Sequence, residues 1–302
     1  MTNKKDIIWI TGSSGFLGQD IISFFKKKFQ IYSLSKVNKN ANFYFDYENE
    51  FYVNKFIADY GKPKYVLHLG WSDVDKNLSK NHYEYNLPSS LRFFKNLINN
   101  DVKNIIFFGT VDEYEGCKGN FDESYSSTKY TNKYAGAKFN VAKKTYEMIR
   151  NTDVKFTHLR LFNTYGSNKQ ETSLVKYIYR NQNLKKIYLS DCNYFRDFIY
   201  IKDVLNCLEL ILRNPFLGTL NIGSGISENL RDFIKIYSKH LGIDFSKFEF
   251  GYKEKPSSEL MVPSKPASLT KIKKYFKWQP YYNLDEGLKD MVKTLKKNGI
   301  QR

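Results

Sequence analysis

Apolar runs alternate with amphipathic segments along the first half of the chain. Helical periodicity follows the first run through Leu17, Ile21 and Phe24, and further helical patterns cover about 49–60, 86–99 and 131–150. Strands that alternate with helices predict an α/β fold with a doubly wound parallel sheet, covered on both faces. The apolar runs, which have the form of buried parallel strands, are Asp6–Thr11, Gln30–Ser35, Asn42–Asp46, Lys64–Gly70, Asn104–Gly109 and Lys155–Leu161.

The pattern becomes less regular beyond residue 162. A basic helix is expected near 170–182 and a strand at Lys186–Ser190, while Arg196–Asp203 and Leu220–Gly223 read as returns to the sheet. Prolines interrupt the segment Pro256–Pro266 and the turn Trp278–Pro280. We therefore expect a Rossmann-type domain over residues 1–162, with returns near 196–223. Residues 163–195 and 224–302 should form a smaller, interleaved substrate-binding lobe.

Composition bounds the class of protein. A chain of 302 residues can bury a core large enough for two closely joined lobes. It has no run of about 18 apolar residues, and Met1 to Lys5 lead straight into a strand, so we expect a soluble, cytoplasmic protein. The three cysteines are widely spaced and form no Cys-x-x-Cys pair, which indicates neither a disulfide framework nor a metal site.

The formal net charge of +17 could indicate a nucleic-acid or anionic-membrane partner. Lysine runs such as Lys26–Lys28 and Lys296–Lys297 instead fall near the ends of helical patterns, where cations complement the helix dipole. The sequence shows no dense stripe of basic and aromatic residues. We expect no nucleic-acid and no membrane partner, although a basic field would attract an anionic nucleotide.

A glycine-rich turn follows the first strand. Gly12 permits a sharp turn, Gly15 lets backbone N–H groups approach a pyrophosphate, and Gly18 lets a helix pack closely on the sheet. The spacing is G-x-x-G-x-x-G, and a purely structural turn would also explain it. As a dinucleotide site, the turn would bind cofactor through Gly12, Ser14, Gly15, Phe16, Leu17 and Gly18.

The end of the second strand bears on the choice of cofactor. NAD-binding units usually place an acid there, on the ribose 2′-hydroxyl. This chain has Ser35 and Lys36, a hydroxyl and an ammonium that suit a 2′-phosphate. We therefore expect the 1–162 domain to bind NADP(H), with NAD as the alternative if Lys36 is only a solvated loop residue.

Three residues further along suit proton transfer. Tyr134 and Lys138 lie one helical turn apart on one face, with small residues between them. A neighbouring ammonium should lower the pKa of the Tyr134 phenol and make it a usable acid or base. Thr110, directly after a predicted strand, could present its hydroxyl to the same substrate oxygen. In isolation such a pair would more often be a packing tyrosine beside a surface lysine.

In this order, the motifs resemble the extended short-chain dehydrogenase/reductase family, in its nucleotide-sugar epimerase, dehydratase and ketoreductase branch. The resemblance covers nearly the whole chain and is more specific for the family than for the reaction. Its markers are Thr11–Gly18, Val66–Gly70, Asn86, Thr110–Tyr114, Tyr134–Lys138, Leu159–Gly166, Arg196–Asp203, Leu220–Gly223, Trp278–Pro280 and Glu286–Leu288.

The resemblance implies further site residues. It places Asp46 near the adenine and Leu69, Gly70 and Asn86 on the cofactor, beside the Tyr134–Lys138 pair. It also implies substrate contacts from Asp112, Asn163 and Arg196, the last two around the diphosphate, which a guanidinium can bind bidentately. The alternative for Arg196 is an ion pair with Asp197 or Asp203.

Two departures from the family pattern restrict the set of reactions that this chain is expected to catalyse. Sugar-nucleotide 4,6-dehydratases carry Thr-Asp-Glu, whereas this chain has Val111 after Thr110 and keeps an acid at Asp112. Full dehydratase chemistry is therefore not expected. The usual tyrosine-glycine pair is also altered, to Tyr114-Glu115-Gly116.

The expected function is an NADPH-dependent reductase of a nucleotide-linked 4-keto sugar, with 6-deoxy sugars as the expected class. The alternatives are an NAD-dependent nucleotide-sugar 4-epimerase and, less favoured because the three catalytic positions are intact, a non-catalytic dinucleotide sensor. The resemblance also implies a homodimer.

Overall fold

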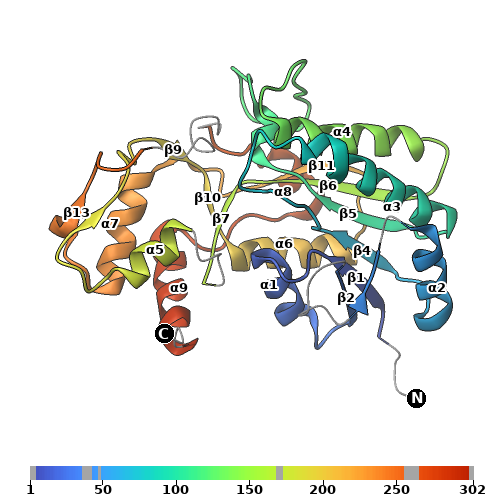
Figure 1. Ribbon diagram of the computed structural model, residues 1–302, viewed down its shortest axis with the longest axis horizontal. Helices are drawn as coiled ribbons and strands as arrows, with labels where there is room; N and C mark the ends of the chain where they lie inside the picture. Colours follow the sequence, from blue (N-terminus) through green and yellow to red (C-terminus); the bar gives the residue numbers. More distant parts are fainter. Residues whose placement is uncertain (1–4, 36–42, 47–48, 168–172, 255–264, 299–302) are drawn as a thin grey trace.

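A seven-stranded parallel sheet organises the larger part of the molecule (Figure 1). The computed structural model describes residues 5–35, 43–46, 49–167, 173–254 and 265–298. The chain runs outward from the central strand β1 to β2 and β3, then returns to β4 on its other side, so the order reverses between β1 and β4. In open α/β sheets ligands bind at such a switch point. In sheet order the strands are β11 (Gly218–Ile222), β6 (Lys155–Leu161), β5 (Asn104–Phe108), β4 (Tyr65–His68), β1 (Ile7–Thr11), β2 (Gln30–Ser35) and β3 (Phe43–Tyr44).

Both faces of the sheet are buried, as the apolar runs predict. Ile7 and Trp9 of β1 belong to a cluster on one face, while Ile8 and Ile10 belong to a cluster on the other, because successive side chains point to opposite faces. The first cluster includes residues of α2, α3 and α4, and the second includes residues of α1 and α6. The bounds are α1 (Phe16–Phe25), α2 (Glu50–Tyr60), α3 (Leu87–Asn99), α4 (Lys133–Met148) and α6 (Ile201–Arg213), with a π-helical turn, η1 (His82–Asn86), before α3 and a 3₁₀ turn, η2 (Val111–Tyr114), after β5.

A smaller lobe lies at one end of the sheet, on the left of Figure 1. Its described residues form the helices α5, α7 and α9, the 3₁₀ turn η3 and short two-stranded pairs, β7 with β10, β9 with β12, and β8 with β13. Its elements are β7 (Asn163–Tyr165), α5 (Leu174–Arg180), β8 (Ile187–Tyr188), β9 (Phe195–Arg196), β10 (Phe198–Tyr200), β12 (Glu228–Asn229), α7 (Leu230–Leu241), η3 (Phe245–Lys247), β13 (Phe248–Glu249) and α9 (Leu284–Asn298); α8 (Thr270–Phe276) packs near β11.

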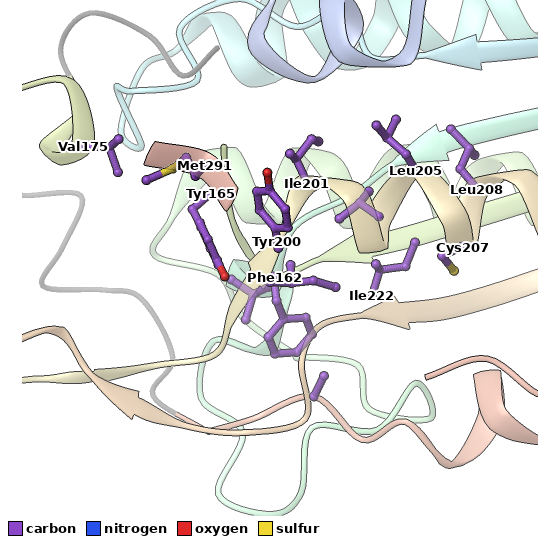
Figure 2. Packing of buried hydrophobic residues seen from close by; sticks show 14 of the residues in the cluster. Phe162, Tyr165, Val175, Tyr200, Ile201, Leu205, Cys207, Leu208, Ile222 and Met291 are labelled. Atoms are coloured by element: carbon purple, nitrogen blue, oxygen red, sulfur yellow. The ribbon is translucent and has the colours of Figure 1, made fainter. Parts of the chain in front are cut away.

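One apolar cluster is continuous between the sheet and the lobe. Figure 2 shows Tyr165 and Tyr200 beside Ile201 of α6, with Met291 of α9 nearby. The rings of Tyr165 and Tyr200 stack with centroids 5.3 Å apart. This shared core fixes the lobe against the sheet.

The six apolar runs of the first half and the run at 220–223 all contribute strands to the main sheet, which confirms the predicted fold class. The prediction that Arg196–Asp203 also returns to the main sheet is wrong. Its residues form β9 and β10, which pair with β12 and β7 outside the main sheet, and from Ile201 onward they enter α6. The apolar residues of α6 recur with helical spacing, which buries one stripe of the helix against the sheet.

Within the described ranges, no helix has the length and apolar character required to cross a bilayer.

Candidate active site

The glycine turn lies at the carboxyl end of β1, at the switch point. Gly12 adopts a left-handed backbone with φ of 66°, and a Cβ there would lie 2.7 Å from the backbone of Leu69 and Gly70. A Cβ at Gly18 would lie 2.6 Å from the Gly12 carbonyl oxygen. These two glycines are therefore required by the packing of the turn itself.

Gly15 has a different environment. It precedes α1 as the N-cap with no side-chain cap, and a Cβ there would meet only the Gly12 carbonyl oxygen, at 3.4 Å. The first N–H groups of α1 and the open space beside Gly15 fit a pyrophosphate. Ser13, which the sequence analysis did not select, adds a buried hydroxyl without a partner among the described residues. Ser14 is half-buried with its carbonyl bonded to Gln19, and Phe16 and Leu17 pack partly buried against the core.

The ends of β2 and β3 lie next to this turn. The Phe45 N–H donates to the Ser35 carbonyl oxygen at 3.0 Å, which places Ser35 close to the half-buried Asp46. Lys36 lies outside the described residues. The preference for NADP over NAD therefore remains a prediction.

A chain of hydrogen bonds holds the end of β4 against the turn. The Gly70 N–H donates to Thr11 Oγ1 at 3.1 Å, and Thr11 Oγ1 lies 2.7 Å from His68 Nδ1. His68 Nε2 in turn lies 3.0 Å from Ser90 Oγ, which donates to the Asn86 carbonyl. Burial, with the nearby Lys138, lowers the pKa of His68 to about 3, so the imidazole is neutral and can accept at Nδ1 while donating from Nε2. Sequence reasoning missed Thr11 and His68 as supports of Gly70.

Asn86 is buried, and its amide is used by the loop after β4. Its oxygen accepts from the N–H and the hydroxyl of Ser72, both at 3.0 Å, and its Nδ2 donates to the Ser72 carbonyl at 3.1 Å. Asn86 thus fixes the loop that follows Leu69 and Gly70. A direct contact with cofactor remains a prediction.

The three expected catalytic residues meet at the carboxyl end of β5. Thr110 follows β5 and caps η2, accepting the Asp112 N–H at 3.3 Å. Tyr134 and Lys138 lie on α4, which begins at an Asn132 cap. The Thr110 side chain acts to lower the pKa of Tyr134, so the two side chains lie near each other. Thr110, Tyr134 and Lys138 therefore converge, although 24 residues separate the first two in sequence.

Lys138 is enclosed by aromatic rings. Its Nζ donates to the Phe108 carbonyl at 2.7 Å and lies 4.2 Å from the centre of the Trp71 ring, 4.8 Å from Phe107 and 5.7 Å from Tyr134. Trp71 is fixed by donating from Nε1 to His82 Nδ1 at 3.1 Å. Trp71 directly follows the marker Val66–Gly70, and that adjacency is the signal that sequence analysis overlooked.

The expected electrostatic effect between Lys138 and Tyr134 is wrong. Burial lowers the pKa of Lys138 to about 7, with Glu113 opposing the change. Burial also raises the pKa of Tyr134 well above its usual value, and the carboxyls of Asp112 and Glu113 raise it further, while the Thr110 side chain acts the other way. The desolvation of both groups outweighs their mutual attraction. The raised pKa favours the neutral phenol of Tyr134 over the phenolate.

Asp112 of η2 and Arg196 of β9 lie close enough for the charge of Arg196 to act on the Asp112 carboxyl. Asp112 is 7% exposed, and burial raises its pKa to about 7, partly offset by the charge of Arg196. Its Oδ1 has no partner among the described residues, and its Oδ2 lies 3.5 Å from Asn132 Nδ2. Arg196 is buried over the Tyr194 ring and donates to the Phe195 carbonyl.

The carboxylates offered as alternative partners of Arg196 bind backbone N–H groups. Asp197 accepts from Ser224, Gly225 and Ala267, and Asp203 accepts from Tyr281 and Tyr282. Asn163 Nδ2 donates to the Asp197 carbonyl at 3.3 Å. Asp197 and Asp203 therefore tie loops of the lobe together.

Comparisons with known proteins agree with this arrangement. A family model described as the NAD dependent epimerase/dehydratase family matches residues 8–223. The chain is 25% identical to the ADP-L-glycero-D-manno-heptose-6-epimerase of Brachyspira hyodysenteriae, with 97% of this chain and 99% of the relative covered. It is 24% identical to the CDP-abequose synthase of Salmonella typhimurium, with 98% and 100% covered. Among solved structures, a UDP-glucose 4-epimerase with UDP-glucose from Thermotoga maritima matches with a TM-score of 0.82 at 23% identity, covering 97% of this chain and 99% of the other.

Proposed function

The chain belongs to the NAD-dependent epimerase/dehydratase family, and we propose from this premise that it reduces a nucleotide-linked 4-keto, 6-deoxy sugar with NADPH. The observation that carries the proposal is the convergence of Thr110, Tyr134 and Lys138 at the carboxyl end of β5, one strand away from β4 and two from the glycine turn after β1. The similarity to CDP-abequose synthase and to two nucleotide-sugar epimerases supports a nucleotide sugar as substrate.

The residues that would hold the dinucleotide are those at the ends of β1 to β4. The uncapped start of α1 and the space beside Gly15 suit its pyrophosphate, and Ser35 and Asp46 lie where the second strand ends. When bound, NADPH supplies the hydride for carbonyl reduction.

The chain's own residues would control the proton. Tyr134, held neutral by its surroundings, donates its phenolic proton to the sugar oxygen that gains negative charge. The Thr110 hydroxyl donates a hydrogen bond to the same oxygen and positions it. The protonated form of Lys138, beside the Tyr134 ring, stabilises the phenolate left after transfer.

The substrate diphosphate would lie toward Arg196. A buried guanidinium that remains charged suits a diphosphate, with which it can form charge-assisted hydrogen bonds. Asp112, neutral below pH 7, can donate a hydrogen bond from the carboxyl whose Oδ1 has no protein partner among the described residues. Asp112 and Arg196 would therefore both lie on the diphosphate side of the substrate.

An NAD-dependent 4-epimerase is the second candidate. Two of the three relatives named above are nucleotide-sugar epimerases, and the same Thr110, Tyr134 and Lys138 constellation would serve a cycle in which the ketone is reduced again. At the end of β2, Ser35 stands where NAD-binding units usually have an acid. This favours NADP as the cofactor and therefore the reductase.

In the deciding experiment, purified protein is mixed with NADPH that carries deuterium at C4 of its nicotinamide ring. The substrates are a panel of CDP-, dTDP-, GDP- and UDP-linked 4-keto-6-deoxy sugars. A reductase consumes one NADPH per ketone and places deuterium on C4 of the sugar. An epimerase interconverts two 4-hydroxy sugars with no net NADPH consumption and with NAD retained through purification. Absence of NADPH oxidation with every ketone in the panel would refute the reductase. The Tyr134→Phe variant serves as the inactive control.

A further inference from the structure

A buried charged cluster lies directly behind Thr110. It consists of Glu113 from η2 and His158 and Arg160 from β6, whose side chains are 0%, 1% and 3% exposed. Glu113 Oε1 accepts the Thr110 N–H at 3.0 Å and lies 3.1 Å from His158 Nε2. Glu113 Oε2 accepts from Arg160 Nε at 3.2 Å. One carboxylate thus connects the backbone of an expected catalytic residue to two side chains of the neighbouring strand.

The surroundings hold this carboxylate in one position. A Cβ added at Gly109 would collide with both Glu113 Oε1 and His158 Nε2, so only glycine fits between Phe108 and Thr110. The His158 ring stacks on Phe107 with centroids 5.7 Å apart, and its Nδ1 lies 3.3 Å from Thr219 Oγ1. Gly109, Phe107 and Thr219 therefore confine the Glu113 carboxylate and the His158 ring.

Arg160 is also held in place by its neighbours. Its NH2 group donates to the Tyr125 carbonyl at 3.0 Å, and its Cζ lies 4.6 Å from the centre of the Tyr114 ring. Burial by itself would raise the pKa of Glu113, but His158 and Arg160 outweigh burial and hold that pKa below its usual value. The carboxylate therefore remains ionised.

Stability alone explains this arrangement poorly. The reciprocal cap between Thr110 and Glu113 needs only a side-chain acceptor at position 113, which a glutamine would supply. A buried ion pair often contributes no more to stability than apolar side chains of similar volume. The cluster's contact with Thr110, which lies near Tyr134, gives it a role that an ordinary helix cap would not have.

We propose that Glu113 is a positioning residue, which holds the Thr110 backbone so that the Thr110 hydroxyl faces the reacting oxygen, with His158 and Arg160 holding the Glu113 carboxylate. The inference rests on the proposed function, because it assigns Glu113 a part in the same reaction. Glu113 itself does not contact substrate in this arrangement; it acts through Thr110.

Two variants at position 113 separate the contribution of the carboxylate charge from that of the side-chain length. Glu113→Asp keeps the charge but withdraws the carboxylate by one methylene, so it cannot reach both the Thr110 N–H and Arg160. Glu113→Gln keeps the length but leaves one carbonyl oxygen for donors on both sides. The matched control is Glu123→Asp, because Glu123 also accepts a backbone N–H, but from Asn221, at 2.8 Å, and not from Thr110.

The kinetic test is a double-mutant cycle between Glu113→Asp and Thr110→Val. We expect Glu113→Asp to lower kcat by about 10- to 100-fold with little change in KM, because a small displacement of a catalytic group has effects of this size. In the Thr110→Val background the same change should have no further effect on kcat. Equal fold losses in both backgrounds would overturn the proposal, as would wild-type kcat in the Glu113→Asp enzyme. Glu123→Asp should keep the wild-type kcat.

Crystal structures of the wild type and the Glu113→Asp and Glu113→Gln variants give a readout that needs no substrate. We expect the Thr110–Tyr134 hydrogen bond in the wild type and its loss in at least the Asp variant. If the wild type reduces no 4-keto sugar, the proposed function fails, while the position of Thr110 in these structures still decides the role of Glu113. If the Thr110 hydroxyl has not moved in either variant, the positioning role of Glu113 is refuted. If the Glu113→Gln variant does not fold, the Glu113→Asp structure decides alone.

Discussion

The glycine turn after β1 allows its structural and binding roles to be separated by mutation. Gly12 has a left-handed backbone, and a Cβ there would lie 2.7 Å from the backbone of the loop after β4. Gly15 has φ of −69°, and a Cβ there would make a single ordinary contact at 3.4 Å. Gly12→Ala should therefore destabilise the fold, whereas Gly15→Ala should leave the fold intact and weaken the binding of NADPH.

The magnitudes follow from these contacts. In Gly12→Ala, the left-handed conformation costs about 1–2 kcal/mol and overpacking against the backbone adds about 1–3 kcal/mol. The free energy of unfolding should fall by roughly 2–5 kcal/mol. Gly15→Ala should change stability by less than about 1 kcal/mol, and the change can be favourable because alanine restricts the unfolded chain. Its methyl group should raise the Kd for NADPH at least about tenfold, which corresponds to about 1.4 kcal/mol.

Both quantities are measured on the same preparations, stability by urea denaturation and affinity by fluorescence titration with NADPH. Gly242→Ala is the matched control, because Gly242 also has a left-handed backbone, with φ of 81°, but a Cβ there meets nothing within 4 Å. It should lose only the conformational part, about 1–2 kcal/mol. A Gly15→Ala protein with wild-type affinity would show that the pyrophosphate does not lie against this turn. A Gly12→Ala protein no less stable than Gly242→Ala would show that the backbone clash is relieved.

Four further changes test the rest of the site. Tyr134→Phe should lower turnover by about 10²–10⁴-fold while the Kd for NADPH stays nearly constant, since only the proton donor is removed; equal turnover would contradict its role. Because the pKa of Lys138 is about 7, its charge is lost as pH rises through 7, so affinity for NADPH should weaken above that pH and Lys138→Met should abolish this dependence in titrations from pH 6 to 9; a Met variant with the wild-type pH profile would assign the titration to another group. Asp112 becomes an anion over the same range and should repel a diphosphate, so Asp112→Asn should flatten the pH dependence of inhibition by nucleoside diphosphates, and an unaltered profile would exclude it from the substrate site. Arg196→Met should weaken nucleoside-diphosphate inhibition by about 10- to 100-fold with no effect on NADPH, as expected for loss of charged hydrogen bonds; unchanged inhibition would place the diphosphate elsewhere.

Much of the fold could be predicted from the sequence because its signals are local. Six apolar runs in the first half and one near residue 220 identified strands of the main sheet, since a strand buried on both faces needs a continuous apolar run. The segment Arg196–Asp203 misled the prediction because it contains a short apolar run, Phe198–Ile201, like those of the strands. Its pairing with β7 and β12 in place of the sheet depends on partners more than 25 residues distant in sequence.

The sequence selected Thr110, Tyr134 and Lys138, which the fold brings together, but it did not predict their electrostatics correctly; their roles remain predictions. The spacing of Tyr134 and Lys138 places both on one face of a helix in any fold that keeps α4 helical. Their pKa values depend on burial by Trp71 and Phe107 and on the nearby carboxyls, which belong to other elements. The predicted sign of the effect on Tyr134 was therefore wrong, and Trp71, His82 and Glu113 were not selected.

By itself, the sequence determined the features that a single strand, turn or helix can contain. The glycine spacing after β1, the order of strands and helices, and the Tyr134–Lys138 face all follow from backbone periodicity and the conformational freedom of glycine. The tertiary structure alone decided which distant groups meet in a dry interior, such as Glu113 with His158, 45 residues apart. Burial and charge pairing act through space rather than along the chain, so the ionisation of Tyr134, Lys138 and Asp112 is set only once the sheet and the lobe have packed.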